Sequence, residues 1–303
     1  MITTTTDLRS YWLDGRAIAP ENAAIHPMTH ALHYGTGVFE GLRAYETPRG
    51  TAIFRLDDHV RRLYASAEAY GLAIPYTPDE ISAAIRATVR ASGLASCYIR
   101  PLVYFGEKTP AFTPRYHCPT HVLLVAIPLG AIHPTSGIRV TLSPVMKTPS
   151  RALPSRVKAS GHYTNAVLAM HDAVARGFED AILLNDRDEI AEATGENVFI
   201  VKDGALRTND LDADVLAGIT RDTVLQMAAD EGIPATIGPI ARAALAAADE
   251  VFLTGTAAEI VPVKAVDDRL YAGDGPVVRR LRERYARVVR GEDPIFESWT
   301  TLA

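Results

Sequence analysis

The chain has 303 residues, 48 % of them apolar and 22 % charged, and its formal net charge is −5. This composition is typical of a folded protein, and the length suffices for two domains. The charge argues against a nucleic-acid partner and a polybasic membrane patch, and no apolar run reaches the ~18–20 residues that span a bilayer. The two cysteines have neither disulfide-framework nor metal spacing, and MITTTTDLRS lacks a signal-peptide pattern, so we expect a cytoplasmic protein without a metal site.

The first part of the chain mixes strand and helix patterns. Thr77 and Glu80 form a capping box, with Pro78 at the first position of a helix. Asp14-Gly15 and residues 48–50 are turn signals between β-rich runs. We therefore expect strands within 11–18, 38–47, 51–56, 97–105 and 121–127, and helices at 57–72 and 77–94.

The second part begins after a stretch rich in proline and glycine at 128–137, which we take as the domain linker. Asp203-Gly204 and residues 186–188 predict the turns of two hairpins. We expect strands within 137–145, 180–186, 189–194 and 197–208, and helices at 163–178, 218–232 and 276–289. The mixture predicts an α+β protein with a domain at 1–127 and another at 138–303.

Lys158, one of five lysines, lies in the strand-like run RVKASGHYTN and precedes Ala159, Ser160 and Gly161. Such a lysine often extends a surface ammonium into solvent. The small neighbours also suit a lysine whose neutral amine forms an imine with a flat cofactor. The residues around Lys158 leave both interpretations open.

Residues 189–221 carry a spaced pattern that resembles the signature of the class IV aminotransferases, enzymes of fold type IV that depend on pyridoxal 5′-phosphate. Its matching positions are Glu192, Asn197, Thr208, Leu216, Gly218 and Arg221. The segments HALHYGTGVFEGLRAYE, FRLDDHVRRL, CYIRPLV and VFLTGTAAEIVPV are similar to branched-chain aminotransferases. The resemblance implies a smaller N-terminal α/β domain, a larger β-rich C-terminal domain, the cofactor at their interface, and a homodimer.

For the cofactor, the resemblance implies that Lys158 forms an internal aldimine and moves the substrate proton. Glu192 would keep the pyridine nitrogen protonated, and Tyr163 would bind the phenolic oxygen. Arg55 would bind the phosphate. The start of a helix at Gly218 and a second helix start near Thr256 would add N–H and hydroxyl donors. The full set implied for the cofactor is Lys158, Arg55, Tyr163, Glu192, Asn197, Leu216, Ile219, Thr220 and Thr256.

For the substrate, the resemblance implies a pocket and carboxylate site formed by Tyr34, Phe39, Arg43, Tyr98, Arg100, Ala257 and Ala258. Arg100 matches the arginine that meets the distal carboxylate of glutamate or 2-oxoglutarate. The aromatic residues would equally serve as core packing on strands. The small molecules implied are a branched-chain L-amino acid as donor and a keto acid as acceptor.

Two loops depart from the branched-chain pattern: residues 106–119 and Pro128-Leu129-Gly130 at the linker. Arg115 and His117 resemble the carboxylate trap of D-amino-acid transaminases, and an arginine binds carboxylate in either case. A transaminase for branched-chain L-amino acids and 2-oxoglutarate is therefore the leading hypothesis. The alternatives are a D-amino-acid or (R)-amine transaminase and an aminodeoxychorismate lyase of the same fold.

Overall fold

The computed structural model describes residues 11–108 and 111–303. The N-terminal stretch and part of the loop 106–119 considered above lie outside these residues. The contacts divide the chain into two units. Unit 1 contains the described residues up to Gly130, with Val157–Gly161 and Val288–Ala303, and unit 2 contains Ala131–Arg156 and His162–Arg287. The first change of unit falls within the expected linker, but the other two segments of unit 1 cross the division expected from the sequence.

Unit 1 is built on an antiparallel sheet with the strand order β17-β5-β4-β6-β7-β1-β2, and β3 also pairs with β6. Its strands are β1 Tyr11–Leu13, β2 Arg16–Ile18, β3 Gly37–Phe39, β4 Leu42–Thr47, β5 Gly50–Phe54, β6 Cys97–Phe105, β7 Thr120–Ile127 and β17 Thr300–Leu302. Its helices are α1 His30–Tyr34, α2 Leu56–Ala69 and α3 Pro78–Ser92, with short 3₁₀ turns at Pro20–Asn22, Pro114–Tyr116 and Pro294–Trp299.

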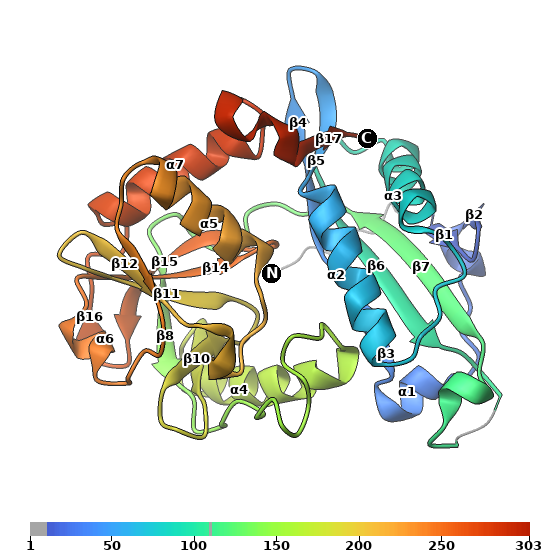
Figure 1. Ribbon diagram of the computed structural model, residues 1–303, viewed down its shortest axis with the longest axis horizontal. Helices are drawn as coiled ribbons and strands as arrows, with labels where there is room; N and C mark the ends of the chain where they lie inside the picture. Colours follow the sequence, from blue (N-terminus) through green and yellow to red (C-terminus); the bar gives the residue numbers. More distant parts are fainter. Residues whose placement is uncertain (1–10, 109–110) are drawn as a thin grey trace. The chain divides into compact units, whose positions relative to one another are not determined.

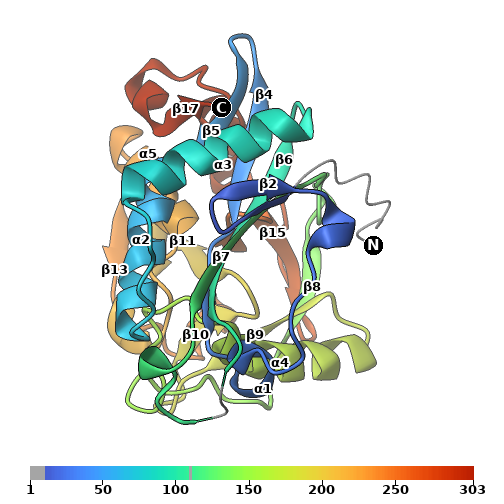
Figure 2. The same cartoon turned by 90° about the vertical axis from the view of Figure 1, so that its right-hand side faces the viewer.

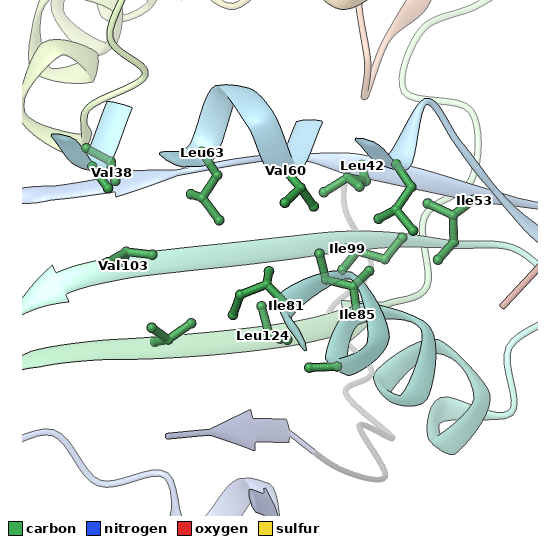
Figure 3. Packing of buried hydrophobic residues seen from close by; sticks show 14 of the residues in the cluster. Val38, Leu42, Ile53, Val60, Leu63, Ile81, Ile85, Ile99, Val103 and Leu124 are labelled. Atoms are coloured by element: carbon green, nitrogen blue, oxygen red, sulfur yellow. The ribbon is translucent and has the colours of Figure 1, made fainter. Parts of the chain in front are cut away.

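Helices α2 and α3 cover unit 1's sheet and enclose its core with strands β4, β6 and β7 (Figure 1). The expected capping box is confirmed, since Thr77 and Glu80 bond each other's backbone N–H groups and start α3. Figure 3 shows side chains of α2, such as Leu63, facing those of the strands and of α3. Because the apolar residues of α2 recur every three or four positions, one face of the helix is buried.

Unit 2 is built on a second sheet, with the order β10-β9-β8-β15-β14-β11-β12-β13, and β16 pairs with β15. Since β10 also pairs with β11, six of these strands close on themselves. The strands are β8 Ile138–Leu142, β9 Asp180–Leu184, β10 Ile190–Ala193, β11 Asn197–Lys202, β12 Ala205–Thr208, β13 Ala235–Ile237, β14 Glu250–Gly255, β15 Glu259–Val266 and β16 Arg269–Leu270.

The helices of unit 2 are α4 Tyr163–Ala175, α5 Ile219–Asp230, α6 Ala244–Ala247 and α7 Pro276–Val288, with a 3₁₀ turn at Leu211–Ala213. Another 3₁₀ turn, Ser160–His162, lies where the chain passes from unit 1 to unit 2. Helix α4 packs on β9, and α5 packs on β13 and β14 (Figure 2). Apolar side chains of β8, β11, β14 and β15 form the core of this unit. Within residues 11–108 and 111–303, each helix is too short or too polar to cross a membrane.

Candidate functional site

Lys158 lies in unit 1, in a segment without regular secondary structure rather than in the strand-like run expected. Its backbone N–H donates to the Ser66 hydroxyl on α2 at 3.1 Å, and its carbonyl accepts from the N–H of Phe39 at 3.0 Å. Ala159 forms a bridge with Val38. The segment is therefore hydrogen-bonded to both α2 and β3, and these bonds fix the backbone position of Lys158.

The small residues after Lys158 serve the packing of the chain itself. Ala159 is fully buried. Gly161 donates to the carbonyl of Gly35, and a Cβ added to Gly35 would lie 2.9 Å from the Cα of Gly161. Two backbones thus approach so closely that only glycine fits. This contact accounts for Gly161 independently of any cofactor.

The amine of Lys158 lies 5.1 Å from the ring centroid of Phe39. Burial lowers the pKa of Lys158 to about 8, helped by the positive charges of Arg62 and Arg100, while Glu40 and Tyr98 oppose the shift. An amine with this pKa has a substantial neutral fraction near neutral pH, and neutral amines are the nucleophiles and bases of lysine chemistry.

Arg100 and Tyr98 extend from β6 beside Phe39. The guanidinium of Arg100 donates to the Tyr98 hydroxyl at 2.7 Å and lies 4.4 Å from the ring centroid of Phe39. Gly41 is required next to them, because a Cβ there would lie 2.1 Å from the Tyr98 hydroxyl. The structure thus brings Phe39, Tyr98, Arg100 and Lys158 together, a cationic and aromatic surface suited to a carboxylate.

Arg43, in β4, is also buried, and its guanidinium donates to the carbonyl of Leu129 at 3.4 Å. Leu129 belongs to the linker sequence Pro128-Leu129-Gly130, which differs from the branched-chain pattern. Tyr34 is 42 % exposed and lies on α1, not on a strand. Its ring contacts His30 and Phe112. Phe112 belongs to the loop 106–119, so Tyr34 adjoins the segment that departs from the family pattern.

Arg55 directly precedes α2 in the left-handed conformation, with φ of 53°. Its N–H donates to the carbonyl of Trp299 at 2.7 Å, and its guanidinium lies 4.6 Å from the centroid of that ring. The guanidinium also bonds the carboxylate of Asp58. A buried arginine held on two sides presents a fixed fork, the geometry that phosphate recognition uses.

Arg115 and His117 are exposed and lie in or next to the 3₁₀ turn Pro114–Tyr116. The side chain of Arg115 passes over Gly71, just beyond the end of α2. Arg115 lies 5.2 Å from the ring of Tyr116. These contacts differ from those of Arg100, so the two arginines occupy separate environments within unit 1.

In unit 2, Glu192 on β10 has both carboxylate oxygens engaged. The ammonium of Lys147 donates to one oxygen at 2.5 Å, and the N–H of Leu216 donates to the other at 2.9 Å. Both side chains of the Lys147–Glu192 pair are mostly buried. A carboxylate fixed by a cation and an amide is held in one orientation, as a partner for a protonated ring nitrogen requires.

Asn197, paired with Glu192 across β10 and β11, organises the start of α5. Its side-chain amide donates to the carbonyl of Leu216 at 3.0 Å. A Cβ on Gly218 would lie 1.9 Å from the amide oxygen of Asn197. The helix begins at Ile219, as expected, and Thr220 is buried in its first turn. The first N–H groups of a helix lack partners within it, which makes this turn an anion-binding element.

The helix start expected near Thr256 is wrong. Residues 256–258 form the turn between β14 and β15, where Gly255 pairs with Glu259 in the antiparallel ladder. Glu259 adopts a φ of 65°, which completes the reversal. The N–H groups of Ala257 and Ala258 therefore belong to a hairpin turn. Tyr163 is the first residue of α4.

Each unit by itself holds groups that suit part of a phosphate-bearing aromatic aldehyde such as pyridoxal 5′-phosphate. Within unit 1, these are the amine of Lys158, whose pKa is lowered, and the buried guanidinium of Arg55. Within unit 2, they are the oriented carboxylate of Glu192 and the helix start at Gly218. The sequence reasoning missed Lys147, because its partner Glu192 lies 45 residues away and no local pattern joins them. It also missed Asp58 and Ser66, whose contacts depend on the fold.

The model of the family "Amino-transferase class IV" matches residues 37–266. A branched-chain-amino-acid aminotransferase of Pseudomonas aeruginosa is 41 % identical over 297 residues, 96 % of each chain. A solved branched-chain aminotransferase of Thermoproteus uzoniensis with norvaline has a TM-score of 0.94 at 40 % identity, covering 97 % of this chain and 99 % of that one. A solved branched-chain amino acid aminotransferase of T.th., complexed with N-(5′-phosphopyridoxyl)-L-glutamate, has a TM-score of 0.94 at 42 % identity, covering 97 % and 98 %. The chain therefore belongs to the class IV aminotransferases, with their mixed α+β fold.

Proposed function

We propose that the protein is a pyridoxal-phosphate-dependent transaminase that moves an amino group from a branched-chain L-amino acid to 2-oxoglutarate. The observation that carries the proposal is Lys158, an amine of lowered pKa beside an aromatic and cationic surface. The names of its relatives support the donor class. The phosphopyridoxyl-glutamate in a similar structure supports the cofactor and the acceptor.

When bound, pyridoxal phosphate supplies an aldehyde that accepts the amino group and a ring that delocalises the electrons left at the substrate Cα. The amine of Lys158 moves the proton at that Cα. The carboxylate of Glu192, oriented by Lys147, holds the proton on the pyridine nitrogen. Tyr163 binds the phenolic oxygen by a hydrogen bond.

In the site that the family resemblance implies, the phosphate would be held by the guanidinium of Arg55, the first N–H groups of α5 at Ile219 and Thr220, and the hydroxyl of Thr256. Asn197 supports this turn through the carbonyl of Leu216. Together these donors would hold the phosphate of the cofactor in place.

The substrate carboxylates are bound by two kinds of group. The N–H groups of Ala257 and Ala258 in the β14–β15 turn bind the α-carboxylate, and Arg100 binds the distal carboxylate of glutamate or 2-oxoglutarate. Phe39 and Tyr98 line the pocket with Tyr34 and Arg43. A branched apolar side chain can use the aromatic faces, whereas a carboxylate uses the guanidinium next to them.

The test is a panel of amino donors added to the purified chain with pyridoxal phosphate. Each half-reaction changes the visible absorbance of the cofactor, so L-leucine, L-isoleucine and L-valine should each produce the change, and 2-oxoglutarate should reverse it. Lys158→Ala should abolish both absorbance changes. Reduction with borohydride should attach the cofactor to the peptide that contains Lys158.

Attachment to another peptide, or to none, would remove the basis of the proposal. Turnover of D-amino acids or (R)-amines, lost in Arg115→Ala and His117→Ala while L-substrates stay unaffected, would favour the D-specific alternative. The relatives do not favour that alternative. Release of pyruvate from aminodeoxychorismate without transamination would favour the lyase.

We also propose that the chain forms a homodimer and acts in the cytoplasm. Helix α4 buries Ala169 and Ala173 against its own unit but leaves Val167, Leu168 and Val174 about half exposed or more. A helix that is apolar on both faces has a second face that is expected to pack against another surface. A second copy of the chain is the cover that the family resemblance implies, and the cysteine content remains the reason for the compartment.

A further inference from the structure

Beneath Lys158, unit 1 contains a buried charged cluster formed by Glu40, His59 and Arg62. Glu40 lies between β3 and β4 and is fully buried, and His59 on α2 is 1 % exposed. Arg62 lies one helical turn further along α2. Buried charges are expensive unless they are paired and bonded, so a carboxylate and a guanidinium that meet at one place beside a buried histidine require an explanation.

The three side chains bond one another in a fixed geometry. Arg62 donates from Nε and an Nη to the two oxygens of Glu40 at 2.6 and 2.9 Å, a bidentate pair. Nδ1 of His59 lies 2.7 Å from the same carboxylate. Because that carboxylate is ionised, Nδ1 carries the proton. Nε2 of His59 has no hydrogen-bond partner among the described residues.

The cluster is connected to Lys158 through two elements. Ser66, which accepts the N–H of Lys158, follows His59 and Arg62 on one face of α2. Phe39, which donates to the carbonyl of Lys158 and faces its amine, immediately precedes Glu40. Movement of the cluster would therefore displace both attachments of the lysine backbone.

The charges of the cluster also act on the amine. Burial would raise the pKa of Glu40, but Arg62 and His59 outweigh it and keep the carboxylate ionised. Burial lowers the pKa of His59, opposed by Glu40, and the ring is neutral. Besides burial, Arg62 on α2 and Arg100 on β6 lower the pKa of Lys158, whereas Glu40, between β3 and β4, and Tyr98 on β6 raise it.

We propose that Glu40, His59 and Arg62 are positioning residues for Lys158. They fix the backbone that carries the amine, and the opposite charges of Arg62 and Glu40 set how much of the amine is neutral near physiological pH. The inference rests on the proposed catalytic role of Lys158. An apolar pair at this place could stabilise the fold equally well. An effect on Lys158 would therefore explain why the buried pair is charged.

The test measures the amine directly in the full-length chain freed of cofactor. The rate at which acetic anhydride acylates Lys158 is followed as a function of pH. Acylation blocks tryptic cleavage at Lys158, so mass spectrometry quantifies peptide 157–176, whose only lysine is Lys158. This measurement needs no cofactor, substrate or turnover. Loss of transamination with a normal titration would therefore contradict the proposed function but not the inference.

The two charges should shift the titration in opposite directions. Glu40→Gln removes the negative charge and should lower the midpoint by about one pH unit. Glu40→Gln combined with Arg62→Met removes both charges, and because Arg62 acts more strongly than Glu40, the midpoint should rise above that of the unaltered chain. Glu68→Gln makes the same charge change at an exposed position of α2 and should leave the midpoint unchanged.

A purely structural ion pair predicts loss of stability without opposed shifts. An unshifted midpoint in Glu40→Gln, or a midpoint in the double variant no higher than that of Glu40→Gln, would overturn the inference. If Glu40→Gln alone does not fold, because Arg62 is left buried without its partner, the neutral double variant still decides the question. His59→Asn keeps a donor for Glu40 without changing the charge, so its midpoint should match that of the unaltered chain. A shift there as large as that of Glu40→Gln would likewise contradict the assignment of the effect to charge.

Discussion

Replacing Lys158 by methionine should stabilise the cofactor-free chain at neutral pH, although it removes the proposed catalytic group. The pKa of Lys158 is about 8 because most of the side chain is buried and the charges of Arg62 and Arg100 lie near it, whereas a solvated lysine has a pKa of 10.5. The difference corresponds to about 3 kcal/mol. Since the side chain is partly exposed and solvent screens it, we expect a gain of about 2 kcal/mol.

The pH dependence fixes the sign of the effect. Below pH 8 the folded chain holds a protonated Lys158 in unfavourable surroundings, and the full cost is present. Between about pH 8 and 10.5 the unfolded chain binds more protons than the folded chain, so the unfolding free energy of the unaltered protein rises with pH. The advantage of Lys158→Met should therefore be largest near neutral pH and disappear as the pH approaches 10.5.

The assay is urea denaturation of both cofactor-free chains at about pH 7 and about pH 10. Lys202→Met is the control, because Lys202 is 52 % exposed and pairs with Asp249 at the surface. Its loss should leave the stability nearly unchanged at neutral pH. A difference between Lys158→Met and the unaltered chain that is the same at both pH values would refute the reasoning, because packing alone would then explain it.

Three further predictions concern unit 2. Lys147→Met leaves one oxygen of Glu192 without its cation, so calorimetry should show that the unfolding free energy falls by about 1–3 kcal/mol. Stopped-flow absorbance should show a slower half-reaction. An unchanged rate would contradict the orienting role of Lys147. Gly218→Ala should weaken pyridoxal phosphate binding at least about tenfold in a fluorescence titration, whereas Gly195→Ala, with open space around the added Cβ, should bind normally. Leu168→Glu places a charge on the exposed apolar face of α4, so the mass measured by sedimentation should fall from that of a dimer to that of a monomer. A dimer that persists would show that this face of α4 is not the interface.

Local sequence signals anticipated much of the secondary structure, because caps, turns and apolar periods act over a few residues. In the sequence, Val60, Leu63, Tyr64 and Ala67 recur at a helical period and therefore share one face of α2. Val60, Leu63 and Ala67 are buried in the structure, and Tyr64 is partly buried against the same core. The same period could not show that His59 and Arg62 on this helix meet Glu40. That contact depends on the placement of β3 beside α2, which no local pattern encodes.

The wrong expectation at Thr256 has a specific physical cause. A Gly-Thr pair before alanines is a reasonable helix start when only neighbouring residues are considered. In the fold, β14 pairs with β15 from Val251 to Gly255, and this ladder requires a short turn between Gly255 and Glu259. Long-range strand pairing therefore overrides the local preference. The donors expected at this turn, the backbone N–H groups of Ala257 and Ala258, are present, but a hairpin turn rather than a helix sets their direction.

Arg55 shows why part of the candidate site could not be located from the sequence. Its left-handed backbone is costly for a residue with a side chain and persists only where the surroundings enforce it. The enforcing residue is Trp299, which accepts the N–H of Arg55 and covers its guanidinium. Strand β17 follows Trp299 and pairs with β5, which ends next to Arg55. The segment 288–303 thus belongs to unit 1 through its contacts with β5 and Arg55, and a division of the chain by sequence position alone separates it from them.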